Sequence, residues 1–124
     1  MTSKDPEHLP IGDLEYLQHI SSVSSPDAVR ELIKSAPTAV EKELRDIRAA
    51  IANYDPEKLK EACHALKGAC YSVQVRRLAH YTKQMEEHSA DIDSAKELLP
   101  PLEEVSRETI AWWHTVLEKD LYRA

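Results

Sequence analysis

The chain has little of what interrupts regular structure, since only Gly12 and Gly68 are glycines among its 124 residues. Scarce glycine together with long amphipathic patterns predicts an all-helical (all-α) chain. No apolar run approaches the roughly 20 residues that a membrane-spanning helix needs, and no signal-peptide pattern opens the sequence. These absences predict a cytoplasmic protein that does not have a membrane as its partner.

Cysteine is also scarce, and the two present cannot form a disulfide with each other. Cys63 and Cys70 lie on one predicted helix, where seven residues at 1.5 Å each separate their Cα atoms by about 10 Å. A disulfide needs Cα atoms within roughly 7 Å. Two free thiols suit a reducing compartment, and we expect both to be small, partly buried helix residues.

The sequence lacks an excess of positive charge, with 16 Lys and Arg against 22 Asp and Glu and a formal net charge of −6. Such a balance argues against nucleic acid or an anionic membrane as the main partner. Hydrophobic residues make up 42% and charged residues 31%, an ordinary proportion for a folded protein. We expect one domain over residues 11–122, after a flexible lead-in over residues 1–10.

Apolar residues at steps of three and four predict a series of amphipathic helices. In the first half of the chain we expect a short helix over residues 12–20 and a second over 26–36, with Ser25 as its N-cap. The third should begin at Pro37, because a proline disfavours helical geometry in the residue before it. This third helix should end near residue 53.

In the second half we expect a central helix over residues 56–72, a helix that begins near residue 75, and a loop with a turn of helix over 89–99. The last long helix should begin at Pro100. It should bury one stripe, which consists of Leu102, Val105, Thr109, Trp112 and Val116. Trp113 then either packs with Ile110 and Leu117 on a neighbouring face or marks an exposed contact. The long helices predict an antiparallel four-helix bundle, with the two N-terminal helices as a cover.

The central helix has one apolar face, made by Leu59, Ala62, Leu66, Ala69 and Val73. His64, Lys67, Gly68 and Tyr71 then fall on the opposite face, toward solvent. A glycine inside a helix costs about 1 kcal/mol relative to alanine, and folding gains nothing from Gly68. We therefore expect a partner that closely approaches the bare backbone beside the imidazole of His64.

The segment from His64 to Gly68, His-Ala-Leu-Lys-Gly, resembles the histidine-containing phosphotransfer (HPt) domain. The family pattern is roughly His-x-Leu-Lys-Gly, then small residues, a glycine and a leucine, and here Gln74, Val75 and Leu78 follow. A helix pair before the motif, a hairpin around it and a long last helix extend the likeness over about residues 11–118. The resemblance implies a phosphorelay intermediate, which accepts a phosphoryl group from a receiver-domain aspartate and passes it to another receiver.

By this resemblance His64 is the phosphorylated nucleophile, and its imidazole has to be exposed and neutral to attack with a ring nitrogen. Lys67 can offer its ammonium to the phosphoryl oxygens. Gly68 leaves room for the incoming aspartyl phosphate. Tyr71 replaces a small residue of the family, and either influences which receiver fits or covers the edge of the core.

Counting back from the turn after the central helix places residues 83–87 across from His64. In this stretch Gln84 or Glu86 can hydrogen-bond the imidazole and orient it, or either simply faces solvent. The turn departs from the family because Gln74 stands where a glycine is usual, so it has to form without the freedom of glycine at positive φ. This departure affects the hairpin geometry rather than the chemistry.

Metal ions commonly stabilise the charge in phosphoryl transfer, but the sequence offers no carboxylate cluster able to hold one. We therefore expect no cofactor, with Mg²⁺ supplied by the receiver. No phosphate loop or kinase signature is present, which predicts a carrier rather than an enzyme. The expected partners are response-regulator receiver domains and a hybrid sensor histidine kinase. The initial Met and the compact length favour a free-standing protein, which we expect to be a monomer.

Two other classes of protein fit parts of the pattern. In the first, the bundle is an interaction module and His64 is never phosphorylated. The second is a di-iron carboxylate bundle, since Glu61 and His64 have the Glu-x-x-His spacing of such sites. That site needs a second such pair and two further inward glutamates. No other histidine here has Glu three residues before it, and Glu61 and His64 are expected to face water.

Overall fold

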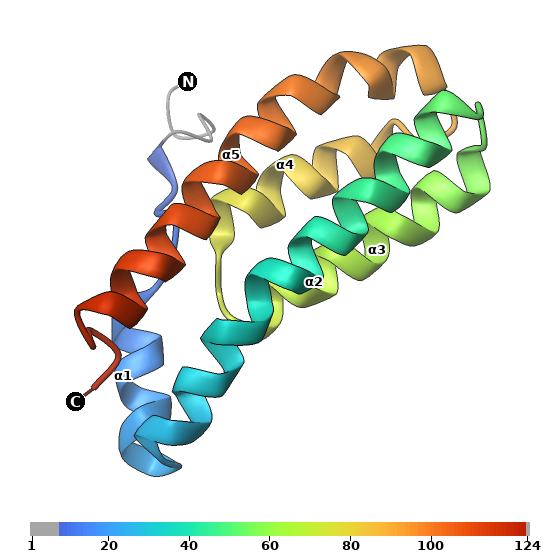
Figure 1. Ribbon diagram of the computed structural model, residues 1–124. Helices are drawn as coiled ribbons and strands as arrows, with labels where there is room; N and C mark the ends of the chain where they lie inside the picture. The colour runs from blue at the N-terminus through green and yellow to red at the C-terminus, as the bar shows by residue number, and fades with distance from the viewer. Residues whose placement is uncertain (1–7, 124) are drawn as a thin grey trace.

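The computed structural model describes residues 8–123, which form five α-helices and no strand. The helices are α1 (Leu14–Val23), α2 (Pro26–Ala52), α3 (Pro56–Ser72), α4 (Arg76–Glu87) and α5 (Ile92–Glu118). In the bundle α2 packs on α3, α3 on α4, α4 on α5, and α5 back on α2 (Figure 1). The predicted all-α class and antiparallel four-helix bundle are confirmed. None of the described helices has both the length and the apolar character needed to cross a bilayer.

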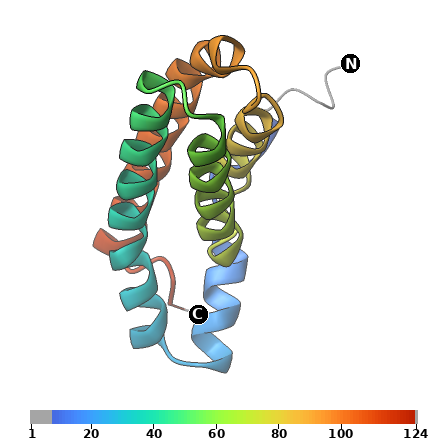
Figure 2. The ribbon, with the colours of Figure 1, turned by 90° about the vertical axis from the view of Figure 1, so that its right-hand side faces the viewer.

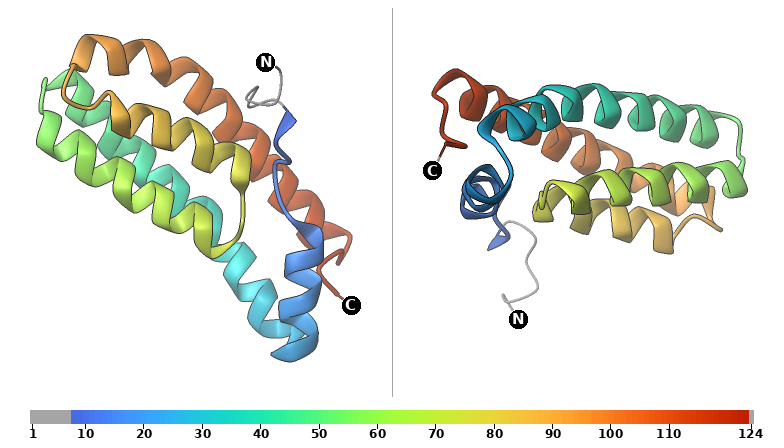
Figure 3. Two further views of the ribbon diagram at one scale, coloured as in Figure 1. Left: turned by 180° about the vertical axis from the view of Figure 1, so that it is seen from behind. Right: turned by 90° about the horizontal axis from the view of Figure 1, so that it is seen from below.

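A single short helix, rather than two, covers the N-terminal end of the bundle. α1 lies against the N-terminal part of α2, beyond the end of the α3–α4 hairpin (Figures 2 and 3). Its Leu17 is fully buried, and the side-chain amide of Gln18 donates to the carbonyl of Leu121 at 3.0 Å. The C-terminal segment therefore closes the same end, where Tyr122 is fully buried.

The predicted helix boundary at Ala36 and Pro37 is wrong, because α2 continues through Pro37 to Ala52. A proline inside a helix removes one backbone donor and crowds the preceding turn. Packing compensates here, since the residues before and after the proline lie on one buried stripe, which includes Val29, Ile33, Val40 and Leu44.

The predicted loop over residues 89–99 is wrong, because α5 already begins at Ile92 and continues through Pro100 and Pro101. The helix begins eight residues before Pro100, at Ile92, where the carboxylate of Asp91 accepts a hydrogen bond from the backbone N–H of Ser94 at 3.3 Å. Ile92 is buried in this first turn, and Ala95 one turn later is buried too. A capped, anchored first turn thus extends the last helix well beyond its two prolines.

The structure also exchanges the predicted roles of the two tryptophans. Trp113 is only 1% exposed, whereas Trp112 is half-buried. The buried stripe of α5 therefore runs through Leu102, Val105, Thr109, Trp113 and Val116. Adjacent helical residues are about 100° apart, so a three-four repeat fits either tryptophan, and the fit against the neighbouring helices decides.

The turn between α3 and α4 forms without glycine, because Gln74 itself adopts a left-handed backbone with φ of 56°. The N–H of Val75 bonds to the carbonyl of Cys70 at 3.0 Å and that of Gln74 to the carbonyl of Tyr71 at 3.4 Å. This is the Schellman arrangement that usually employs glycine. Two other helix ends use the same device with non-glycine residues, Tyr54 after α2 and Asp120 after α5.

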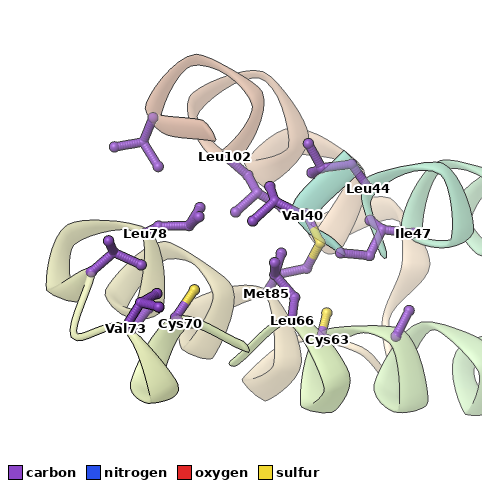
Figure 4. Close-up of a cluster of buried hydrophobic side chains, with 14 of the residues drawn as sticks. Val40, Leu44, Ile47, Cys63, Leu66, Cys70, Val73, Leu78, Met85 and Leu102 are labelled. Atoms are coloured by element: carbon purple, nitrogen blue, oxygen red, sulfur yellow. The ribbon is translucent and has the colours of Figure 1, made fainter. Parts of the chain in front are cut away.

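Cys63 and Cys70 are more deeply buried than predicted, at 0% and 1% exposed, and neither forms a disulfide. Figure 4 shows both sulfur atoms in the core, among side chains such as Leu66 and Met85. Burial raises the pKa of each thiol to about 12. The core therefore holds both cysteines in the neutral, unreactive form.

We expect both thiols to react with Ellman's reagent at pH 8 at least about 1,000-fold more slowly in the native chain than in the urea-unfolded chain, because reaction requires opening of the core. The contribution of the buried neutral thiols to the free energy of unfolding should be fully present below pH 9 and should fall as the pH rises from about 9 to 12. Unfolded thiols ionise near 9.0 but native thiols ionise only at about 12. Rapid reaction of one native thiol would show that α3 opens locally.

The segment before α1 is held against the beginning of α4. Arg77 donates from Nε to the carbonyl of Leu9 at 2.9 Å and from its backbone N–H to the carbonyl of Pro10 at 3.2 Å. The ring of Trp112 covers Gly12 so closely that a Cβ at this glycine would lie 2.3 Å from ring carbons. Residues 1–7 of the predicted lead-in lie outside the described residues, while its last two residues are fixed by Arg77.

The two glycines should therefore respond to alanine with opposite signs. Gly12→Ala should destabilise the chain by about 1–3 kcal/mol, because the half-buried Trp112 ring must move. Gly68→Ala should stabilise it by about 0.5–1 kcal/mol, since an added Cβ meets no atom within 4 Å and alanine favours the helix. Urea unfolding of the three chains measures both changes, and equal stabilities would contradict the assignment.

Candidate functional site

His64 lies near the middle of α3 on its solvent-facing side. Its side chain is 78% exposed, whereas its neighbours Ala62, Cys63 and Leu66 are buried in the bundle. Packing of these neighbours and the Asp55 cap, whose carboxylate accepts from the N–H of Lys58 at 3.1 Å, give the helix a fixed position. The predicted presentation of an exposed imidazole on a rigid helix is therefore observed.

Glu86 of α4 connects His64 and Lys67 across the α3–α4 hairpin. Its Oε1 accepts a hydrogen bond from Lys67 Nζ at 2.6 Å, and its Oε2 lies 3.7 Å from His64 Nδ1. The distance from Oε2 to Nδ1 is longer than a hydrogen bond. Even so, this carboxylate oxygen faces the Nδ1 side of the His64 ring. The hydrogen bond to Glu86 raises the pKa of Lys67, so its ammonium stays charged.

The two residues proposed to orient the imidazole have different positions on α4. Gln84 precedes Glu86 by two residues, which is about 200° around the helix, so the two side chains leave opposite sides of it. The backbone carbonyl of Gln84 accepts a hydrogen bond from His88 Nδ1 at 2.8 Å. The structure thus brings Glu86, and not Gln84, to His64.

Gly68 has no role in the fold that the structure reveals. Its φ is not positive, and a Cβ at this position would meet no atom within 4 Å. Neither backbone strain nor close packing therefore requires glycine here. Tyr71, one turn from Lys67, is 53% exposed, so it stands on the surface rather than covering the core fully.

An open groove of about 530 Å³ borders His64. It is lined by Glu57, Lys60, Glu61, His64 and Glu86. Glu61 and His64 are both exposed, so they do not form the inward-facing pair that a di-metal bundle needs. Within residues 8–123 no group of three or more His, Cys, Asp or Glu side chains is arranged to hold a metal ion.

The sequence does not predict the ion pair between Lys67 and Glu86, because its pattern places Lys67 at the phosphoryl oxygens and Glu86 at the imidazole. The only sequence signal for it is the hairpin register, which places residues 83–87 opposite His64. Arg77, at the start of α4, bonds to the carbonyl of Leu9 and lies 3.4 Å from Glu108.

Comparisons with known proteins agree with this geometry. The family model of the Hpt domain matches residues 28–120. The crystal structure of histidine-containing phosphotransfer protein B (HptB) from Pseudomonas aeruginosa PAO1 is similar with a TM-score of 0.82 and 22% identity, covering 89% of this chain and 96% of that chain. At this identity the likeness supports the fold, and no curated protein matches the sequence. The chain therefore belongs to the Hpt domain family and is a histidine phosphotransfer intermediate of a phosphorelay.

Proposed function

We propose that His64 is the residue that accepts the phosphoryl group from a receiver-domain aspartate and passes it to another receiver. The observation that carries this proposal is an imidazole 78% exposed on a packed helix. It lies one turn from Lys67 and from Gly68, a glycine that the fold does not require. An attacking imidazole has to reach an aspartate that lies within another protein. Exposure together with rigidity is therefore what the reaction needs.

The Glu86 carboxylate favours the tautomer of His64 in which Nδ1 carries the proton, since Oε2 faces that nitrogen at 3.7 Å. The lone pair then resides on Nε2. In the proposed step Nε2 attacks phosphorus, the N–P bond forms, and the P–O bond to the aspartyl carboxylate breaks with its electron pair left on the carboxylate. The reverse step delivers the group to the next aspartate.

Three further residues of α3 would contact the receiver or its phosphoryl group. Lys67 contributes positive charge next to the transferred group. Gly68 allows the receiver backbone or the aspartyl phosphate to approach α3 without a side chain in between. Tyr71 offers an exposed aromatic ring at the edge of this face, and aromatic side chains commonly contribute strongly to protein interfaces.

In this proposal the protein is a carrier, not an enzyme, and it acts in the cytoplasm as a monomer. Its partners are response-regulator receiver domains and a hybrid sensor histidine kinase. Phosphoryl transfer depends on positioning and on stabilisation of charge. The chain supplies the nucleophile and Lys67, and the receiver would supply the Mg²⁺ ion and the aspartate.

The test is phosphoryl transfer from a panel of ³²P-labelled, phosphorylated receiver domains to the purified chain. We expect label to appear on the chain from at least one receiver within minutes, with the stability of phosphohistidine, labile in acid and stable in base. If no receiver transfers label to a chain that circular dichroism shows to be helical, the protein would instead be an interaction module with an unmodified His64.

A further inference from the structure

The single carboxylate of Glu86 contacts both side chains that would handle the phosphoryl group. It lies 2.6 Å from Lys67 Nζ through Oε1 and 3.7 Å from His64 Nδ1 through Oε2. The side chains of Lys67 and Glu86 are only 23% and 15% exposed. Because solvent screens such a covered pair less than an open surface pair, its charges act more strongly on the neighbouring imidazole.

Phosphorylation makes the His64 position more negative. Before the step the imidazole is neutral, with a proton on Nδ1 and a lone pair on Nε2. After the step the ring keeps that proton and carries one positive charge, while the phosphoryl group on Nε2 carries two negative charges. The aspartyl carboxylate leaves with the electron pair of the broken P–O bond. The site of His64 thus gains one net negative charge beside Glu86.

We propose that Glu86 is a positioning residue that sets the transfer equilibrium toward release of the phosphoryl group. Its negative charge disfavours the net negative charge that His64 gains on phosphorylation, and its carboxylate competes with the phosphoryl oxygens for the Lys67 ammonium. Both effects disfavour storage on His64 and favour delivery to a receiver aspartate. This inference rests on the proposed function of His64 and adds how firmly that residue holds the group.

The other charged residues around the groove have weaker claims to this role. Glu57, Lys60 and Glu61 are all exposed, so water screens their effect on His64. Glu86 alone among these groove residues combines a covered carboxylate with a bonded lysine. Removal of its charge should therefore change the equilibrium more than removal of a neighbouring charge on the same helix.

The experiment measures how a fixed amount of ³²P-phosphoryl group divides between the chain and a receiver that phosphorylates it, approached from phosphorylated receiver and from phosphorylated chain. For Glu86→Gln we expect the equilibrium to shift toward His64 by about three- to tenfold, because the attraction between Glu86 and the positive ring offsets most of its repulsion of the phosphoryl group. Lys67→Met should shift it in the opposite direction. In the double variant the effect of Glu86→Gln should be smaller, because no ammonium is released.

Two variants separate charge from structure. Glu87→Gln removes the same charge from the next residue of α4, which is exposed, and should leave the equilibrium unchanged. Glu86→Asp keeps the carboxylate and should stay near wild type. Melting curves confirm that each variant is folded, and the equilibrium constant compares only folded species.

Failure of this inference and failure of the proposed function give different results. If wild type accepts label but Glu86→Gln leaves the equilibrium unchanged, or moves it toward the receiver, the role of Glu86 is overturned and that of His64 stands. If Glu87→Gln matches Glu86→Gln, a general charge effect replaces the specific one. If wild type accepts no label from any receiver, the proposed function fails and this inference fails with it.

Discussion

Replacement of His64 by glutamine is expected to abolish phosphoryl acceptance while the bundle stays folded. Glutamine keeps a polar side chain of similar length but has no ring nitrogen able to form an N–P bond. The side chain is 78% exposed, and exposed substitutions usually change stability by less than about 0.5 kcal/mol. Label transfer from a phosphorylated receiver measures the first effect, and urea unfolding measures the second.

A matched control is His114→Gln, which removes an exposed histidine from α5. His114 lies on α5 and not on α3, so the His114→Gln chain should still accept wild-type amounts of label on His64. Retained label on His64→Gln would assign the phosphoryl group to another side chain. Loss of label in both variants would point to a defect in the protein preparation rather than at the site.

The starts of α2 and α3 were predictable because they depend on local chemistry. Ser25 and Asp55 each accept a hydrogen bond from the backbone N–H three residues later, as a cap followed by proline predicts. The interior prolines misled the prediction, since the local penalty at Pro37 is offset by buried residues on both sides of it. That compensation depends on helices far away in sequence, and local patterns do not contain it.

The site divides in the same way between local and distant information. The exposure of His64 and Gly68 follows from their spacing on one helix and was predictable, whereas the Lys67 side chain is only 23% exposed. The bond from Lys67 to Glu86 depends on the register of the α3–α4 hairpin, and that register depends on how the turn closes. Gln74 closes it in a conformation that glycine adopts far more easily, which no spacing rule predicts.

Gly68→Gln is the second large effect that we expect, with activity and stability moving in opposite directions. The new side chain would project from the exposed face of α3 that carries His64, where a receiver has to approach. Misplacement of reacting groups by about 1 Å can lower a rate about 100-fold, so transfer should fall at least that far. The free energy of unfolding should rise by about 0.5 kcal/mol, because glutamine is the better helix former.

Ala111→Gln is the appropriate control, because it adds the same side chain to an exposed alanine on α5. It should transfer label at the wild-type rate, whereas Gly68→Ala should fall between wild type and Gly68→Gln if bulk at this position obstructs docking. A rise in KM with little change in kcat would place the obstruction in receiver binding. Normal transfer by Gly68→Gln would mean that the receiver does not approach this backbone. The glycine would then stand in α3 at a cost to stability that neither the fold nor the reaction explains.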